Sequence, residues 1–110
     1  VLYNDEKPKL DLNDSNFQDA VNLWFSDELN ATWTYGHISD WNVSAVTDMS
    51  NAFKNRSSFN ENLNSWDVSS VTNVESMFNG AFTFNQEIGD WNVSKVRNMR
   101  SMFRDARTFN

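Results

Sequence analysis

The feature that most constrains this chain is a pattern that returns every 25 residues. Segments 38–62, 63–87 and 88–110 align without a gap, although the third stops two residues short. The anchors that recur in register are Trp41, Trp66 and Trp91; Val43, Val68 and Val93; Val46, Val71 and Val96; Phe53, Phe78 and Phe103; and Phe59, Phe84 and Phe109. One unit of this length cannot bury its own apolar side, whereas stacked units share a continuous core. The sequence therefore predicts three tandem repeats that stack on one another.

The apolar spacing changes within each unit. Trp41 and Val43 are two residues apart, as on one face of a strand. Val46, Met49 and Phe53 follow at spacings of three and four, as on one stripe of a helix. Stacking would then set parallel strands on one face and helices on the other, so we expect an α/β fold. Because Trp41 shares its parity with Val43, we expect the Trp column in the core and not on a carbohydrate-binding surface.

Residues 1–37 are predicted to form an N-terminal cap. An amphipathic helix is indicated by the apolar positions Phe17, Ala20, Val21 and Trp24. We expect Asp14 or Ser15 to begin this helix, since Ser15 and Gln18 fit a capping box. Terminal units of repeat domains are commonly atypical in this way.

The third repeat has no such cap in the sequence. Its chain stops at Asn110, which is equivalent to Asn60 of the first repeat. We expect strand edges and part of its core residues to be exposed, namely Ile88, Trp91, Met102 and Phe103. Two explanations stay open: the chain is a fragment of a longer array, or the edge meets another molecule, including a second copy in self-association.

The repeat resembles a known bacterial motif. Its pattern is W-[ND]-V-S-x-V-T-x-M-x-x-x-F, followed by F-N-x-x-[IL]-x-x-W. This resembles the surface-protein repeat of BspA-like proteins and of Listeria and Mycoplasma lipoproteins. The resemblance implies a leucine-rich-repeat-like α/β solenoid, with an extracellular or cell-surface location and a role in adhesion or recognition. It implies no catalytic residue, so none is transferred to this chain.

Composition excludes several classes of function. The chain has no Cys, a single His, and a net charge of −6. Overall acidity argues against nucleic acid and anionic membranes as main partners, and no apolar run is long enough to span a membrane. His37 has no Ser–His–Asp spacing around it. We therefore expect no enzyme activity, no cofactor and no metal site.

The charge is distributed unevenly along the repeats. Segment 63–87 carries three acidic and no basic side chains, whereas segment 88–110 carries five basic and two acidic side chains. The third repeat therefore has a basic stripe, formed by Arg97, Arg100, Arg104 and Arg107. Without a nucleic-acid reading motif, this stripe does not indicate a nucleic-acid-binding protein.

Polar residues of the opposite parity form the candidate binding face. They are Asp40, Asn42 and Ser44; Ser65, Asp67 and Ser69; and Asp90, Asn92 and Ser94. Stacked repeats would set them in a polar grid that binds a basic peptide, a glycan or calcium, or that is simply solvated. No calcium-loop motif supports the metal. In the return loops, Asn60, Asn85 and Asn110 are expected to form a hydrogen-bonded ladder.

The sequence thus predicts a non-catalytic module that recognises a protein or glycan ligand. The alternative is a structural spacer that presents neighbouring domains. A fold alone does not choose between them.

Overall fold

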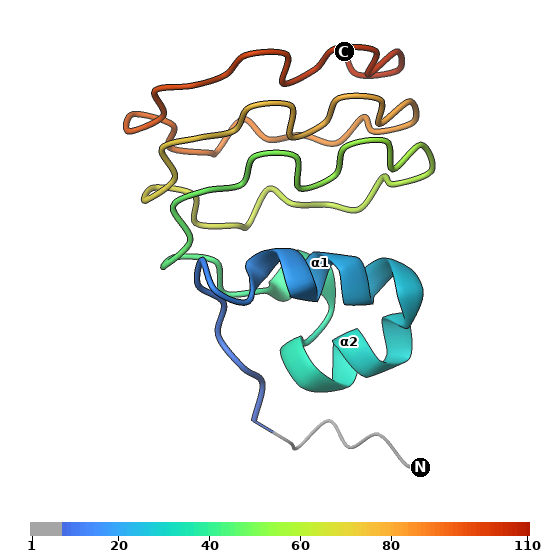
Figure 1. Cartoon of the computed structure of the whole chain (residues 1–110), viewed down its shortest axis with the longest axis vertical. Coiled ribbons are helices and arrows are strands. Elements are labelled where there is room, and N and C mark those ends of the chain that lie inside the picture. Colours follow the sequence, from blue (N-terminus) through green and yellow to red (C-terminus); the bar gives the residue numbers. More distant parts are fainter. Residues whose placement is uncertain (1–7) are drawn as a thin grey trace.

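Two helices and three turn-rich repeats make up residues 8–110, the part of the chain that the computed structural model describes. Helix α1 spans Phe17–Ser26, α2 spans Glu28–Tyr35, and a 3-10 turn, η1, spans Ile38–Asp40. The repeats lie one above another, with the first repeat beside the helices and the third at the far end (Figure 1).

Helix α1 buries the stripe that its spacing predicts. The buried side chains are Phe17, Ala20, Val21 and Trp24. The predicted cap was wrong, because the helix begins after Asn16 without a side-chain cap. Ser15 instead donates its amide and hydroxyl to Asn13 Oδ1, at 2.9 and 2.6 Å. Asp27 separates the two helices, and its carboxylate accepts the Asn30 amide at the start of α2.

The helices predicted within the repeats do not form. The stretch that follows Val46 is a series of turns, in which the Ala52 amide donates to the Met49 carbonyl at 3.2 Å and the Arg56 amide to the Phe53 carbonyl at 3.1 Å. Asn51 and Asn55 have positive φ angles of 60° and 63°, which an α-helix of L-residues does not tolerate. Consecutive turns reproduce apolar spacings of three and four, so the sequence pattern did not distinguish them from a helix.

The predicted parallel strands are also absent from residues 8–110. Adjacent segments share only single-residue parallel bridges, at Asn13–Ala45, Asp48–Asn73 and Asn73–Asn98. An Asx turn bends the chain directly after Trp41, because Asn42 Oδ1 accepts the Ser44 amide at 3.1 Å. The expected leucine-rich-repeat-like α/β solenoid, with strands on one face and helices on the other, is therefore wrong. The described residues contain helices only before the repeats and in η1, at the start of the first.

In each turn series, every second backbone N–H group donates to a carbonyl of the following repeat. The N–H groups of residues 49, 51, 53 and 55 donate to the carbonyls of residues 73, 75, 77 and 79, at 2.7–2.9 Å. Those of residues 74, 76, 78 and 80 donate to the carbonyls of residues 98, 100, 102 and 104, all at 2.9 Å. We call each set of four N–H groups a donor row. These bonds between repeats take the place of the i to i−4 bonds of a helix. The N–H groups of the turn series therefore have acceptors although no helix forms.

Aromatic columns fill the space inside the turns. Phe78 stacks between Phe53 and Phe103, with ring centroids 5.6 Å apart on both sides. Phe84 stacks in the same way between its equivalents Phe59 and Phe109, at 5.9 Å. The three repeat Trp side chains are buried, as predicted for a core column. Each indole N–H donates to a carbonyl, which satisfies the polar atom inside the core: Trp41 to Gly36, Trp66 to Ile38 and Trp91 to Leu63.

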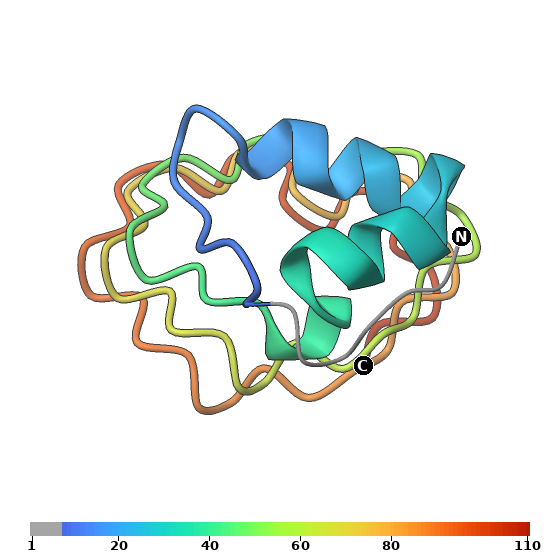
Figure 2. The same ribbon diagram turned by 90° about the horizontal axis from the view of Figure 1, so that it is seen from below.

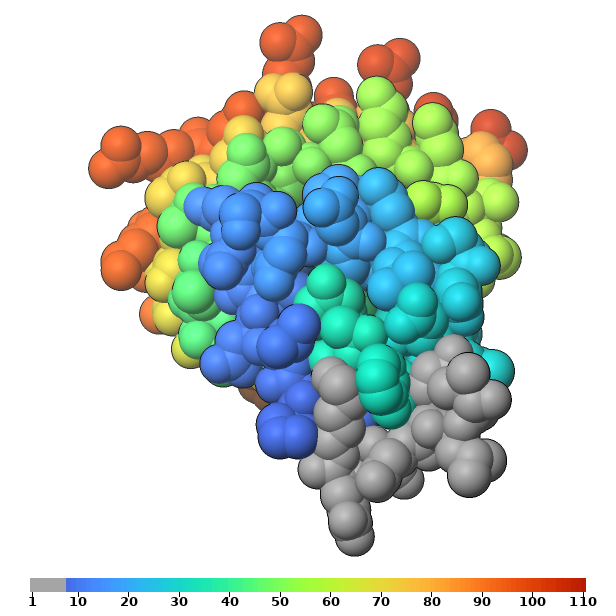
Figure 3. Space-filling view, turned by 60° about the horizontal axis from the view of Figure 1, so that its bottom comes forward, coloured from blue at the N-terminus to red at the C-terminus, as the bar shows by residue number. Residues whose placement is uncertain are grey.

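The N-terminal region covers the outer side of the first repeat. Trp24 of α1 packs edge-on against Trp41, and Phe25 packs edge-on against Phe53 and Phe59. The Arg56 guanidinium lies 4.1 Å from the centre of the Phe25 ring. Both helices lie across this end of the stack in the view along it (Figure 2). In the space-filling view, the side chains of the N-terminal region lie over the first repeat (Figure 3).

Candidate interaction surfaces

The nine polar residues predicted as a binding face do point outward. All are exposed except Ser69, which is half-buried. One residue in each repeat is committed to an Asx turn, with its Oδ1 accepting the amide of the serine two positions later: Asn42 from Ser44, Asp67 from Ser69, and Asn92 from Ser94. The turns shape the backbone, so the side-chain oxygens involved are not free for a ligand.

Two other members of this face, Ser65 and Asp90, also have side-chain partners within the protein. Ser65 Oγ donates to the Ser39 carbonyl at 2.8 Å, and Asp90 Oδ2 accepts from Asn64 Nδ2 at 2.9 Å. The Ser69 hydroxyl, which donates to the Asp67 carboxylate at 2.6 Å, lowers the pKa of Asp67 from its ordinary value of 3.8. Within residues 8–110, no three His, Asp or Glu side chains gather as a metal site would require. Ligand binding by this face stays a prediction.

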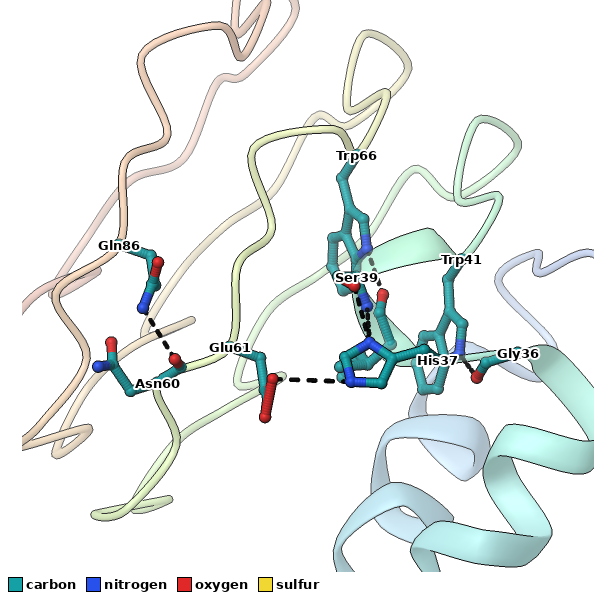
Figure 4. Close-up of polar contacts among 9 residues, drawn as sticks. Gly36, His37, Ser39, Trp41, Asn60, Glu61, Trp66 and Gln86 are labelled. Carbon is teal, nitrogen blue, oxygen red and sulfur yellow. Dashed lines mark hydrogen bonds and ion pairs between the residues drawn. The ribbon is translucent and has the colours of Figure 1, made fainter.

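His37 lies in a contact group that superficially resembles a catalytic triad. Its Nδ1 is 2.7 Å from Ser39 Oγ, and its Nε2 is 3.8 Å from Glu61 Oε1 (Figure 4). The second distance is too long for the hydrogen bond that orients a catalytic histidine. Nδ1 also accepts the Ser39 backbone amide at 3.2 Å, which makes this a local turn at the start of η1. The ring packs edge-on against Trp24, so His37 joins the helices to the first repeat.

The third repeat exposes apolar side chains that its predecessors bury. Met99 is 50% exposed, whereas its equivalents Met49 and Val74 are 1% and 3% exposed. Val93 is 38% exposed, whereas Val43 is fully buried. Four further members of buried columns are only partly covered here: Ile88, Val96, Phe103 and Phe109. The third repeat therefore leaves apolar side chains uncovered at positions where the first two repeats bury them.

The same side carries the last donor row. The N–H groups of residues 99, 101, 103 and 105 are equivalent to the two donor rows that bind the following repeat. They have no hydrogen-bond acceptor among residues 8–110. We call these four amides, together with Val93, Met99 and the four partly covered side chains, the open face.

Sequence reasoning anticipated an uncovered third repeat but placed the exposure imperfectly. Trp91 and Met102 were expected to be partly exposed, but both are buried. Trp91 stays in place because its indole N–H donates to the Leu63 carbonyl at 2.9 Å. The exposure of Val93 and Met99 was not predicted. The 25-residue register did indicate it, because both residues occupy columns that are apolar in the first two repeats.

The third repeat also carries exposed basic side chains. The five basic residues of the third repeat are all exposed: Lys95, Arg97, Arg100, Arg104 and Arg107. The equivalent positions of the second repeat are Ser70, Thr72, Glu75, Asn79 and Phe82, none of which is basic. No helix among the described residues is long and apolar enough to cross a membrane.

Comparison with known proteins gives one match. The model of a family described as "Mycoplasma protein of unknown function, DUF285" matches residues 19–110. No curated protein matches the chain, and no solved structure matches it. The finer likeness to the BspA-like repeat stays a prediction. Because the match covers most of the chain, the protein belongs to the DUF285 family of Mycoplasma proteins of unknown function.

Proposed function

We propose that this protein is a non-catalytic recognition module and that the open face of its third repeat binds a polypeptide, either a segment of the same protein that follows Asn110 or a separate partner. The open face carries this proposal, because it combines exposed apolar side chains with four backbone N–H groups in a row. The first and second repeats have the same donor row, and in each case the following repeat supplies the acceptors. A polypeptide supplies both the carbonyl oxygens and the apolar side chains that such a surface requires.

The energetic argument concerns what a ligand would replace. In the unbound protein, water hydrates the four amides, so they are not costly until they are covered. A purely apolar ligand would bury them without acceptors, at about 1–3 kcal/mol each. A ligand with matched carbonyls avoids this penalty and also removes Val93 and Met99 from water. Polypeptide binding is therefore favoured over binding of an apolar small molecule.

We propose that the module takes part in adhesion at the bacterial surface. An extracellular location is part of this proposal. The polar face around Asp40, Asp67 and Asp90 is a second surface for a protein or glycan. A spacer role remains the alternative, in which neither surface has a ligand.

An array of extracellular proteins and glycans tests the proposal. Wild type, Met99→Asp and Leu29→Asp are applied in parallel. Leu29 is 68% exposed on α2, at the opposite end of the molecule from the open face, so it is a matched control. We expect protein ligands that bind wild type and Leu29→Asp but not Met99→Asp. Binding that is unaffected by Met99→Asp, or no binding at all, would exclude the open face as the recognition site, and no binding would favour the spacer.

A further inference from the structure

We infer that a row of arginines on the outer surface of the third repeat binds a linear sulfated polysaccharide. We call this row the arginine ridge, and its members are Arg97, Arg100, Arg104 and Arg107. The ridge lies outside the open face, and its ligand is independent of the polypeptide binding proposed above. Three properties support this site: its exposure, its fixed backbone and its unpaired charge.

The ridge faces solvent through columns that no repeat buries. All four arginines are exposed. Their equivalents in the first two repeats are exposed or half-buried: Thr47 and Thr72, Ser50 and Glu75, Lys54 and Asn79, and Ser57 and Phe82. In the space-filling view, side chains of the third repeat, in orange to red, extend past the outline of the first two repeats (Figure 3). The ridge is therefore exposed because it lies on the outer side of the turn series, as its equivalents do in both preceding repeats.

The backbone of the ridge is fixed to the second repeat along its whole length. At each arginine, or at the residue that follows it, a main-chain hydrogen bond joins the two repeats: Arg97 N–H to the Thr72 carbonyl at 2.8 Å, the Ser76 and Gly80 amides to the Arg100 and Arg104 carbonyls at 2.9 Å, and Thr108 N–H, beside Arg107, to the Phe82 carbonyl at 3.2 Å. The order and spacing of the arginines are thus set before a ligand binds, which lowers the entropic cost of binding.

The positive charge of the ridge is not neutralised within residues 8–110. The third repeat contains five of the nine Lys and Arg residues of the chain but only two of its fifteen Asp and Glu residues. Among the described residues, the only carboxylate within ion-pair distance of a basic side chain is that of Glu61, beside His37. Glu75, which shares a column with Arg100, instead accepts the side-chain amide of Asn98 at 2.9 Å. An anionic ligand therefore meets guanidinium groups that no carboxylate of residues 8–110 holds.

The guanidinium group determines which anion fits. It presents its N–H donors in a planar fork, which binds two oxygens of one oxyanion at once. Arg107 is already positioned, because its guanidinium lies 4.8 Å from the centre of the Phe82 ring. A sulfate group stays ionised at physiological pH and presents three oxygens, so sulfates repeated along one thin chain match a row of arginines.

Other polyanions fit the ridge less well. A polypeptide interface needs apolar side chains at its centre, but Phe82 is the only large apolar side chain in the ridge columns, and its ring already packs against Arg107. A single-stranded nucleic acid stacks successive bases on aromatic rings, and these columns offer this one ring. The second repeat has three acidic and no basic side chains, so it repels a polyanion as wide as duplex DNA. A polysaccharide chain that lies along the ridge avoids these three conflicts.

The probe is a size-defined oligosaccharide of heparin, which is a linear and heavily sulfated polysaccharide. Its binding to the whole 110-residue chain is measured by calorimetric titration at several salt concentrations, from about 50 mM upward. We expect the logarithm of the association constant to fall linearly with the logarithm of the salt concentration. The slope should be about −3, as for four contacts to a single-stranded polyanion. Absence of binding at the lowest salt concentration overturns the inference.

Substitutions locate the site. Arg104→Gln should weaken heparin binding several-fold, and the double variant Arg100→Gln, Arg104→Gln should weaken it at least about tenfold and halve the salt slope. Lys54→Gln is the matched control, because Lys54 is exposed at the position of the first repeat that is equivalent to Arg104. We expect it to bind heparin as wild type does, and circular dichroism checks that all variants fold. Wild-type affinity in the double variant, or equal losses in Arg104→Gln and Lys54→Gln, would show that the ridge is not the binding site.

Three further probes test the chemistry of the ligand: desulfated and N-acetylated heparin of the same length, an oligothymidylate, and a polyglutamate peptide. We expect each to bind at least about tenfold more weakly than heparin at the same salt concentration. Equal binding of the desulfated form overturns the role of sulfate. Binding of the oligothymidylate or the peptide as tightly as heparin overturns the assignment to a polysaccharide. If heparin fails to bind while the array ligands still depend on Met99, this inference is wrong but the proposed function stands.

Discussion

The carboxylate of Asp14 binds Thr47 in the position that a preceding repeat would otherwise fill. Asp14 Oδ1 accepts the Thr47 amide at 2.8 Å, and Oδ2 accepts the Thr47 hydroxyl at 2.6 Å. One repeat further, the Thr47 carbonyl accepts both the amide and the hydroxyl of Thr72, at 2.7 and 3.3 Å. The Asp14 carboxylate thus provides Thr47 with the acceptor that the Thr47 carbonyl provides to Thr72.

Replacing Asp14 should destabilise the N-terminal end of the stack. Asp14→Ala leaves the Thr47 amide without its acceptor, and we expect the free energy of unfolding to fall by about 1 kcal/mol, as for the loss of a helix N-cap. Urea unfolding followed by Trp fluorescence measures this change. Asp11→Ala is the matched control, since Asp11 is exposed and no side-chain hydrogen bond of its own is present among residues 8–110. Equal losses in the two variants would show that the bonds to Thr47 are not stabilising.

The same contact should make stability depend on pH in the acid range. The Thr47 hydroxyl lowers the pKa of Asp14 below its ordinary value of 3.8, and burial opposes this only in part. A lowered pKa means that the stabilisation is complete above the unfolded value and is lost as the pH falls through the folded one. The difference in unfolding free energy between wild type and Asp14→Ala should therefore be constant near neutrality and shrink below about pH 3.8. A difference that stays unchanged down to pH 2 would contradict the assignment.

Asp67 provides a second and separate acid-sensitive site. Its pKa is lowered by the Ser69 hydroxyl, with a further contribution from the Ser69 amide. Asn42 and Asn92 form the same turn without a charge. Asp67→Asn should therefore leave the fold and the neutral-pH stability nearly unchanged, while wild type loses stability relative to the variant as the pH falls below 3.8. NMR titration of the Asp67 carboxyl carbon checks the direction of the pKa, and a titration midpoint above 3.8 would contradict it.

The outcome for the fold shows what a spacing can and cannot determine. The 25-residue register correctly predicted which residues share a column, because equivalent side chains must contact each other in any stack. Phe53, Phe78 and Phe103 do so, and the Asn85 amide donates to Asn60 Oδ1, as the expected ladder requires. The register contains no information on where the backbone N–H groups bind, so it could not separate a helix from a series of turns.

For the surfaces too, the sequence indicated which side chains are exposed but not how the backbone is hydrogen-bonded. Asp40, Asn42 and their equivalents are exposed as expected, although the strands on which that expectation rested are absent from residues 8–110. The structure shows in addition that Asn42 and Asp67 hold turns together. The donor row of the open face involves main-chain atoms alone, so no residue type marks it. The equivalent residues Ser76 and Ser101, in the donor rows of the second and third repeats, have positive φ angles, and serine is not a residue from which such angles are predicted.

Gly80 should be required for close contact between the first two repeats. Its φ is +76°, and a Cβ built there would lie 2.5 Å from Asn55 Oδ1 and 3.4 Å from Asn55 Cα. We expect Gly80→Ala to cost about 1–3 kcal/mol, since it combines positive φ with a steric conflict. Gly89→Ala is the control, because a Cβ at Gly89 meets nothing within 4 Å, and it should change stability by less than about 0.5 kcal/mol. Similar losses from both substitutions, measured by thermal unfolding, would count against this explanation.

Arg56 tests how the helices are joined to the repeats. The equivalent residues of the later repeats are Ala81 and Ala106, and only the first repeat has a helix to contact. The Arg56 guanidinium lies over Phe25 and donates to Asn22 Oδ1 at 3.4 Å. Arg56→Ala removes both contacts without disturbing the columns, so we expect a loss of about 0.5–1 kcal/mol and faster hydrogen exchange in α1 and α2 than in the second and third repeats. Arg104→Ala is the control, since it removes an exposed arginine at the other end of the stack. If Arg56→Ala accelerates exchange uniformly, the helices and the repeats unfold as one unit and Arg56 is not a local attachment between them.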